Sequence, residues 1–407
     1  MHFAFCIDLY YFFRISALGA TATLPLLGAA SVDRRLSPQR AAGLLAVAAT
    51  FHAFAYVHND VCDLALDRTQ PQRAMYPLVR GTVTPRAALA VALACVPLAF
   101  LLDHLLVATT DDRRPTTDDR RPTTALRLSA AIGYRLSAIG YRRRRHLATA
   151  FALLALYNRW GKACPFPPLT DALQGLGWAA LLRYGAASAG PDTALTGLLG
   201  AYELLLIMMV NGLHGALRDL ENDAAHGART TAILFGARVA AGDELRVPPA
   251  LVGYGLALQS LLLALPAWAV ATNMAGRERH AAAVWVGAVG AATLAVLVAA
   301  VRGGRTTEPG MAHLVLVLSA PVALVAPGLP PATGAMLLAA HLLPLLPNSL
   351  TYDALRWALG AARGRQGDRG QGTGDRAAAR CAKTACYNNP YHEGAENSVQ
   401  GTGRSTA

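Results

Sequence analysis

The chain has 407 residues, of which 54% are hydrophobic and only 15% charged, and its mean hydropathy is positive. This composition excludes an ordinary soluble globular protein and is typical of a polytopic membrane protein. The formal net charge of +12 comes almost entirely from arginine. In a membrane protein such an excess of arginine sets the orientation of the spans and favours contact with anionic lipid. It does not indicate nucleic-acid binding, for which no basic and aromatic motif is present.

Apolar segments recur along most of the chain and predict membrane-spanning helices. Ten segments qualify, at about 9–30, 41–57, 87–107, 146–158, 171–189, 193–217, 249–272, 280–301, 311–327 and 331–347. The predicted fold class is therefore all-α, a polytopic membrane bundle of about nine or ten transmembrane helices. We expect one transmembrane domain, residues 1–359, followed by a disordered basic tail, residues 360–407, that is rich in Gly, Arg and Asn.

An Arg-rich insertion, residues 108–146, separates the third and fourth segments. The heptapeptide DDRRPTT occurs twice in succession from Asp111, and RLSAAIGY and then RLSAIGY follow from Arg127. A run of four arginines, Arg142 to Arg145, ends the insertion. These repeats are too few and too polar for a solenoid. They represent either a slippage-type duplication in a loop or a clamp for lipid headgroups. The fourth segment is short for a bilayer of about 30 Å, so we expect it to borrow residues from the insertion or to tilt.

A cluster of acids, Asn59-Asp-Val-Cys-Asp-Leu-Ala-Leu-Asp67, ends the second apolar segment. On a continuous helix Asp60, Asp63 and Asp67 lie at i, i+3 and i+7, so their carboxylates point to one side. Three like charges on one face require water or a cation. Mg²⁺ that is bound by one or two carboxylates and by the oxygens of a phosphate is the usual solution.

A second acid cluster follows the sixth apolar segment, with Asp219 and Asp223 at i and i+4. Four predicted spans separate the two clusters, so both lie on the same side of the membrane. They predict one shared site for a metal-bound diphosphate. Arg73, Arg80 and Lys162 lie in loops on this side and are placed to bind the remaining diphosphate oxygens.

Five further polar residues each have two interpretations. Arg14 either meets the carboxylate of an acceptor or snorkels to the membrane interface. Tyr56 and Tyr157 either shield a carbocation through cation–π contacts or belong to an interfacial aromatic belt. Asn211 and His214, at i and i+3, are expected to share a helix face, where they either line an acceptor pocket or bond to a neighbouring helix.

The distribution of arginine and lysine between loops predicts the orientation. The loops on the side of the two acid clusters carry the larger share of these residues if the insertion is set aside. The positive-inside rule then places the clusters on the cytoplasmic side of the cell membrane.

These motifs resemble those of the UbiA superfamily of intramembrane prenyltransferases. The cluster from Asn59 matches the pattern NDxxDxxxD, and DLENDAAHGART from Asp219 matches DxxxD with its following Gly and Thr. YNRWGK, which ends at Lys162, is similar to the family's loop after its fourth helix, and the residues that follow Arg73 also fit. The resemblance covers residues 9 to about 301. It departs from the pattern in the insertion, in the tail and in the tenth predicted helix, since the family usually has nine.

The resemblance implies a helical bundle around a central cavity that is open to lipid. By position, the residues that would hold Mg²⁺ and the diphosphate are Asn59, Asp60, Asp63, Asp67, Asp219 and Asp223. Arg73 and Lys162 would bind the diphosphate directly, and the five aspartates and Lys162 would form the catalytic set.

The implied activity is a Mg²⁺-dependent prenyl transfer from an isoprenyl diphosphate to a lipophilic or aromatic acceptor. A terpene cyclase of the same superfamily, in which an alkene of the prenyl chain captures the cation, is the alternative. An ion-coupled transporter is less favoured, because the acids lie at helix ends and not near the bilayer midplane.

Overall fold

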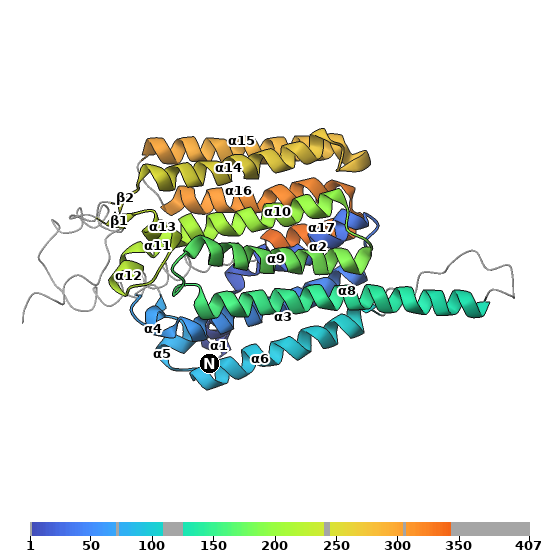
Figure 1. Cartoon of the computed structure of the whole chain (residues 1–407), viewed down its shortest axis with the longest axis horizontal. Coiled ribbons are helices and arrows are strands. Elements are labelled where there is room, and N and C mark those ends of the chain that lie inside the picture. Colours follow the sequence, from blue (N-terminus) through green and yellow to red (C-terminus); the bar gives the residue numbers. More distant parts are fainter. Residues whose placement is uncertain (1, 71–72, 109–124, 240–244, 304–306, 343–407) are drawn as a thin grey trace, which may run out of the picture. The chain divides into compact units, whose positions relative to one another are not determined.

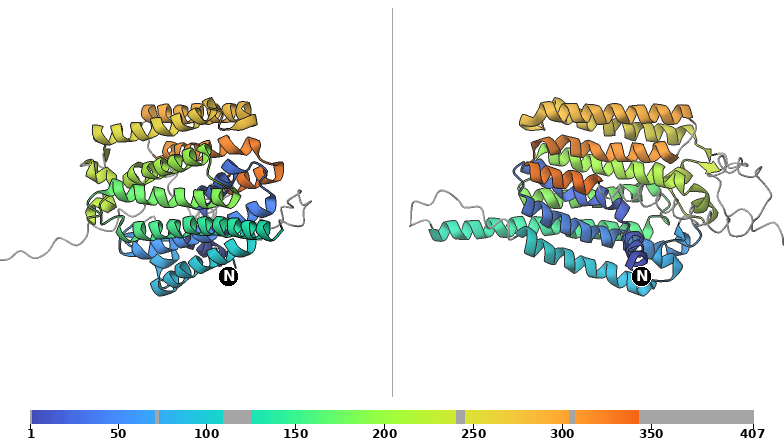
Figure 2. Two further views of the ribbon diagram at one scale, coloured as in Figure 1. Left: turned by 45° about the vertical axis from the view of Figure 1, so that its right-hand side comes forward. Right: turned by 180° about the vertical axis from the view of Figure 1, so that it is seen from behind.

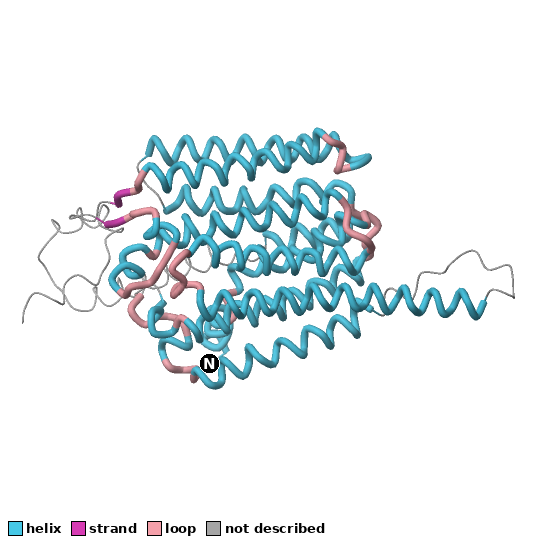
Figure 3. Tube along the Cα trace, in the orientation of Figure 1, coloured by secondary structure: helices cyan, strands magenta, loops and turns pink. Residues whose placement is uncertain are grey.

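The computed structural model describes residues 2–70, 73–108, 125–239, 245–303 and 307–342. The chain divides into two units, Met1–Asn348 and Ser349–Ala407. The second unit, and with it the predicted tail, lies outside the described residues. The described part of the first unit is helical apart from two short antiparallel strands, β1 (Arg238–Val239) and β2 (Leu245–Arg246) (Figure 3). The prediction of an all-α fold is confirmed.

The helices follow the order of the predicted spans, with short helices between them. The first half contains α1 (His2–Phe12), η1 (Ile15–Ala17), α2 (Leu18–Val32), α3 (Pro38–Cys62), α4 (Leu64–Asp67), α5 (Pro77–Arg80), α6 (Pro85–Leu102), the π-helix η3 (Asp103–Ala108) and α8 (Ala125–Trp160). The second half begins with α9 (Pro167–Ala189), α10 (Ala194–Met209), the π-helix η4 (Val210–Gly215), α11 (Ala216–Arg218), α12 (Leu220–Ala225) and α13 (Thr231–Leu234). It ends with α14 (Pro249–Ala271), η5 (Gly276–Glu278), α15 (Arg279–Gly303), α16 (Thr307–Val325), η6 (Ala326–Gly328) and α17 (Pro331–Leu342).

Polar caps set where two of the long helices begin. The Ser37 hydroxyl accepts a hydrogen bond from the backbone amide of Arg40 (3.3 Å) before α3. The Thr84 hydroxyl does the same for Ala87 (3.2 Å) before α6. A proline follows each cap, where its fixed φ suits the first helical turn. Both helices therefore begin earlier than the apolar segments alone predict.

The long helices run side by side in the first unit (Figures 1 and 2). Five described helical segments are long and apolar enough to cross a membrane, at Ile15–Val32, Pro38–Cys62, Pro85–Val107, Ala194–Arg218 and Pro249–Ala271. Large apolar side chains, such as Leu256 on α14 and Val284 on α15, are exposed on the outer helices, as expected for a surface in contact with lipid. The protein is thus a multi-pass membrane protein, and the total of nine or ten spans stays a prediction.

The predicted first span, residues 9–30, is divided between α1, η1 and α2. The helix breaks at Arg14, which adopts the left-handed conformation with φ 45° and ψ 51°. Such a conformation costs a non-glycine residue about 1–2 kcal/mol. His52 of α3 stabilises the break, because its Nε2 donates a hydrogen bond to the Phe13 carbonyl (2.8 Å) while its Nδ1 accepts one from the Thr21 hydroxyl (2.7 Å).

Helix α8 is 36 residues long and continues from the second pair of repeats through the predicted fourth span (Figure 1). The short span therefore borrows residues from the insertion, as expected. The two DDRRPTT repeats, residues 111–124, lie in the segment between η3 and α8, which is outside the described residues.

The four-arginine run is partly buried inside the protein. Arg143 is 2% exposed, and its Nε lies 2.6 Å from Oδ1 of the fully buried Asp103 on η3. The Tyr184 hydroxyl of α9 donates a second hydrogen bond to Asp103 (3.0 Å). Arg143 is therefore not available to bind a lipid headgroup, because its charge is neutralised within the bundle.

Helices α2 and α9 approach closely through two glycines. A Cβ atom on Gly28 would lie 1.9 Å from the Leu182 carbonyl oxygen, and one on Gly185 would lie 1.9 Å from the Pro25 carbonyl oxygen. Small residues permit this kind of backbone contact between membrane helices.

We expect Gly185→Ala to lower the free energy of unfolding by about 1–3 kcal/mol, since the added methyl group forces two backbones apart. Gly197→Ala on α10 is the matched control. Nothing lies within 4 Å of its Cβ position, so this change should be neutral or should stabilise the helix by up to about 1 kcal/mol. Unfolding of both variants in detergent tests the pair, and equal effects would contradict the close packing of α2 on α9.

Candidate active site

The two acid motifs lie at the same end of the helical bundle, where α4, α5 and α11 to α13 gather (Figure 1). The Thr69 hydroxyl donates a hydrogen bond to Oδ1 of Asn222 (2.9 Å), which joins the loop after the first motif to the second motif. The backbone amide of Arg229 donates to the carbonyl oxygen of Lys162 (2.9 Å). Three segments far apart in the chain therefore meet in one place, in agreement with the same-side prediction.

Each motif interrupts its helix at an aspartate. Asp63 (φ −93°, ψ 4°) lies between α3 and α4, and Asp219 (φ −99°, ψ 9°) lies between α11 and α12. Both backbones have φ and ψ in the sparsely populated bridge region of the Ramachandran plot, where many active-site residues are found. Each is followed four residues later by a second aspartate, Asp67 or Asp223, whose amide hydrogen-bonds back to the carbonyl of the first (2.8 and 2.9 Å).

The prediction of a continuous helix from Asp60 to Asp67 was therefore wrong. The chain turns at Asp63, and the Nδ2 of Asn59 donates a hydrogen bond to the Asp63 carboxylate across the turn (3.3 Å). Asp60 and Asp67 still approach a common partner. Arg14 forms an ion pair with Asp60, and its Nη2 lies 3.9 Å from Asp67 Oδ2.

Arg14 thus lies inside the first acid cluster, and its side chain is only 14% exposed. It does not snorkel, and the partner that the structure places beside it is an acid of the motif. Its guanidinium lies 5.4 Å from the ring centroid of Tyr56 and 5.5 Å from that of Tyr76. Arg73 contributes a second cation, with Nε 3.8 Å from Asp67 Oδ1.

The second cluster also carries basic partners. Lys162 Nζ lies 3.1 Å from Asp223 Oδ1. Arg218 donates two hydrogen bonds to the neighbouring Asp219 (2.9 and 2.7 Å). Sequence reasoning missed the pairing of Arg218 with Asp219, because adjacent residues carry no helical periodicity that would reveal it. Arg80, by contrast, pairs with Asp8 of α1, and its described ion pair is not with either acid cluster.

Tyr157 of α8 lies within electrostatic range of Asp63, Asp223 and Tyr56. It therefore faces the same end of the bundle as the acids. The next residue, Asn158, is buried and donates hydrogen bonds from Nδ2 to the Ala55 carbonyl and to His58 Nδ1 (both 3.0 Å). These bonds tie α8 to α3 just before the first motif.

Asp171 is a residue of the site that sequence reasoning missed. It is buried near the start of α9 and accepts a hydrogen bond from the hydroxyl of Thr231, which follows the second motif. This contact anchors the loop that carries Arg229 to the bundle. The available signal was a carboxylate at the start of an apolar segment, which is costly there and usually functional.

The shared face predicted for Asn211 and His214 is not present. Asn211 donates to Gln174 Oε1 on α9, whereas His214 contacts His313 on α16. The reason is the π-helical geometry of η4, whose wider turn rotates residues at i and i+3 away from one another. Both side chains bond to neighbouring helices, which was one of the two interpretations.

Burial and neighbouring charges shift the titration of three motif acids. Burial raises the pKa of Asp63 to about 6, against the opposing effect of Lys162. Burial also raises the pKa of Asp223, which Lys162 partly offsets. At Asp219 burial alone would raise the pKa, but the hydrogen bonds and charge of Arg218 outweigh it and the pKa is lowered.

The donor set suits a hard cation. Within the described ranges no three His, Cys, Asp or Glu side chains converge into a ready-made metal site. Mg²⁺ does not require one, because it typically takes one or two carboxylates together with waters and substrate phosphates. The aspartates of both motifs offer oxygen donors, and four of these carboxylates, on Asp60, Asp67, Asp219 and Asp223, are buried. The residues that could hold Mg²⁺ are those predicted from the two motifs.

Comparison with known proteins agrees with this arrangement. A sequence profile of the UbiA prenyltransferase family matches residues 19–110. Comparison with curated proteins by sequence gave no match. Solved structures of UbiA homologues have a similar fold. The apo UbiA homologue from Aeropyrum pernix K1 aligns with a TM-score of 0.52 at 20% identity, over 77% of this chain and 97% of its own.

The second is a UbiA homologue from Archaeoglobus fulgidus that was solved with GPP and Mg²⁺ bound. It aligns with a TM-score of 0.54 at 16% identity, over 83% of this chain and 99% of its own. These alignments show that the described bundle has the UbiA fold. The sequence match to residues 19–110 and the shared fold both point to similarity with UbiA proteins.

Proposed function

We propose that the protein is a Mg²⁺-dependent intramembrane prenyltransferase that ionises an isoprenyl diphosphate and transfers the prenyl group to a lipophilic or aromatic acceptor. The observation that carries the proposal is the pair of matched aspartate motifs at one end of the bundle, with Lys162 and Arg73 beside them. The A. fulgidus homologue of the same fold binds GPP and Mg²⁺, which supports this substrate class.

The roles follow from the chemistry of the residues. Asn59, Asp60, Asp63, Asp67, Asp219 and Asp223 provide oxygen ligands for Mg²⁺, which when bound acts as a Lewis acid on the diphosphate oxygens. Lys162 and Arg73 bind the remaining diphosphate oxygens and stabilise the charge that develops as the allylic C–O bond breaks. The apolar helices exclude water from the resulting carbocation.

Polar side chains buried in the bundle favour transfer over cyclisation. Asn211, His214, Gln259 and Glu203 are half-buried or buried on α10, η4 and α14. Such groups suit an acceptor with a polar head, whereas a cyclase needs a closed cavity lined with aromatic rings. We further propose that the site faces the cytoplasm, because loops at this end carry most of the basic residues once the insertion is set aside.

The test uses purified protein with Mg²⁺ and geranyl, farnesyl or geranylgeranyl diphosphate, with diphosphate release and products followed by mass spectrometry. We expect slow release without an acceptor and fast release after addition of a membrane-lipid or phenolic extract. Fast release of a cyclic hydrocarbon without an acceptor would identify a cyclase instead. Absence of any metal-dependent diphosphate binding would refute both enzymes.

A further inference from the structure

A chain of three polar side chains lies within the bundle next to the second acid motif. His313 of α16 bonds through Nε2 to Oε1 of Gln259 on α14 (2.7 Å), and through Nδ1 to Nε2 of His214 on η4 (3.2 Å). His313 and Gln259 are 4% and 7% exposed. Figure 1 shows α10, α14 and α16 as neighbours. Polar groups that are buried among apolar membrane helices cost free energy and are usually functional.

The hydrogen bonds determine where the protons lie. The carbonyl oxygen of Gln259 can only accept, so His313 Nε2 carries a proton. A neutral His313 then accepts at Nδ1, and His214 must donate from Nε2. A neutral His214 therefore presents its lone pair at Nδ1, and no hydrogen bond to this atom is made by any described residue. The same logic orients the histidine of a hydrolytic triad, where a neighbouring group selects the tautomer that acts as a base.

The amide of Gln259 has a second feature. Its Nε2 is buried and has no hydrogen-bond partner among the described residues. Gln259 also lines a cavity of about 30 Å³ together with Tyr202 and Val317. A cavity of this size has room for about two water molecules. A water molecule there can accept a hydrogen bond from Nε2, which leaves Oε1 directed at His313.

His214 lies close to the second motif along the same stretch of helix. The Asp219 amide hydrogen-bonds to the carbonyl of Gly215, the residue after His214 (3.0 Å). His214 precedes Asp219 by five positions, which corresponds to about 7 Å along a helix. A prenyl chain whose diphosphate is bound at Asp219 and that extends into the bundle therefore has its first carbons at the depth of His214.

We infer that His214 Nδ1 is the proton acceptor of the reaction, and that His313 and Gln259 are positioning residues that hold its tautomer. The inference rests on the proposed function. The diphosphate leaves with the electron pair of the C–O bond, and a carbon or oxygen of the acceptor then forms a bond to the allylic cation. The attacked centre loses one proton to His214 Nδ1, and the electrons of that C–H or O–H bond complete the neutral product. Cyclisation also releases one proton and needs the same base.

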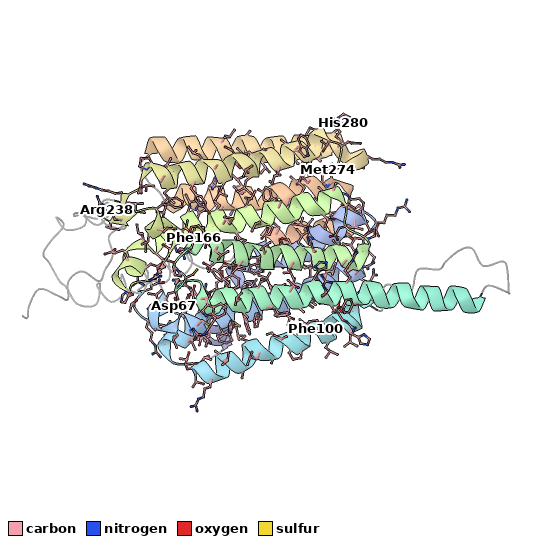
Figure 4. The ribbon with its side chains drawn as sticks, in the orientation of Figure 1. Asp67, Phe100, Phe166, Arg238, Met274 and His280 are labelled. Carbon is pink, nitrogen blue, oxygen red and sulfur yellow. The ribbon has the colours of Figure 1, made fainter. Side chains whose placement is uncertain are left out.

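The experiment compares His214→Asn, Gln259→Leu and Gln259→Glu with wild type, with His280→Asn as a control. His280 is exposed at the end of the bundle opposite Asp67 (Figure 4). Binding is measured with Mg²⁺ and the unreactive geranyl thiolodiphosphate, and turnover with geranyl diphosphate and a phenolic extract. Thermal unfolding in detergent confirms that each variant is folded.

His214→Asn should bind the analogue within about twofold of wild type but form product about 100-fold more slowly, the usual contribution of a general base. Gln259→Leu should form product about tenfold more slowly than wild type, as expected when the hydrogen-bond partner of a ligating or catalytic histidine is removed. Gln259→Glu, which keeps an acceptor oxygen, should restore turnover, and His280→Asn should match wild type in both assays.

Turnover of His214→Asn at the wild-type rate would overturn the inference. Loss of analogue binding in that variant would also overturn it, because His214 would then be a structural residue. A wild-type protein that does not bind the analogue with Mg²⁺ would instead refute the proposed function. One that binds the analogue but never turns over geranyl diphosphate would refute both.

Discussion

Asp219→Asn should abolish metal-dependent release of diphosphate, with a decrease of about 1000-fold or more, equivalent to about 4 kcal/mol of transition-state stabilisation. The carboxylate is at the break between α11 and α12 and is bound by Arg218. Asparagine has a similar shape but carries no charge. It therefore binds Mg²⁺ more weakly and leaves the charge on the departing diphosphate less well stabilised. Asp63→Asn should have the same effect, because Asp63 holds the equivalent position in the first motif.

Glu221→Gln is the matched control for Asp219→Asn. Glu221 lies in the same short helix, α12, but its side chain is exposed. Diphosphate release by this variant should remain within about twofold of wild type, since a solvated surface charge at this distance contributes little. Equal losses in Glu221→Gln and Asp219→Asn would mean that the general negative charge of the loop matters, and not the matched aspartates.

Arg143→Met should lower the free energy of unfolding by about 3–5 kcal/mol, because it leaves the carboxylate of Asp103 buried without its main counter-ion. Asp103 is fully buried, and Arg144, which lies 3.4 Å from it, is itself half-exposed. Unfolding in detergent measures the effect. Diphosphate binding should be unchanged in the folded variant, because the pair and the acid motifs lie on different helices.

The double variant Asp103→Asn/Arg143→Met separates the cost of an unpaired charge from lost packing. It should recover most of the stability, since removing both charges of a buried pair is often neutral. Arg145→Met is a control at an exposed position of the same run and should change stability by less than about 0.5 kcal/mol. Full stability of Arg143→Met would show that the pair does not hold α8 against η3.

Local patterns were sufficient to locate the acid motifs and most of the long helices. Asp63, Asp67, Asp219 and Asp223 each lie where an apolar segment ends, and such carboxylates are recognisable because burying them without a cation is costly. Capping residues refine the boundaries, since α3 and α6 begin at Ser37 and Thr84. The breaks at the two aspartates could not be predicted in the same way, because continuous helices satisfy the same local spacing.

Contacts between distant segments account for what the sequence did not reveal. Arg14 meets Asp60 across 46 residues, and Arg143 meets Asp103 across 40. Neither pairing has a local signal, because each depends on which helices become neighbours. The π-helical turn at η4 likewise separates Asn211 from His214, although their spacing fits one face of an α-helix.

The sequence by itself determined the membrane class, the all-α fold and the two diphosphate-type motifs, because composition, hydropathy and spacing are properties of single segments. Only the tertiary structure decided which cation meets which acid, where the helices break and how His214, His313 and Gln259 align. The physical reason is that buried charges and polar groups must find partners, and the packing of the helices determines which partners lie within reach.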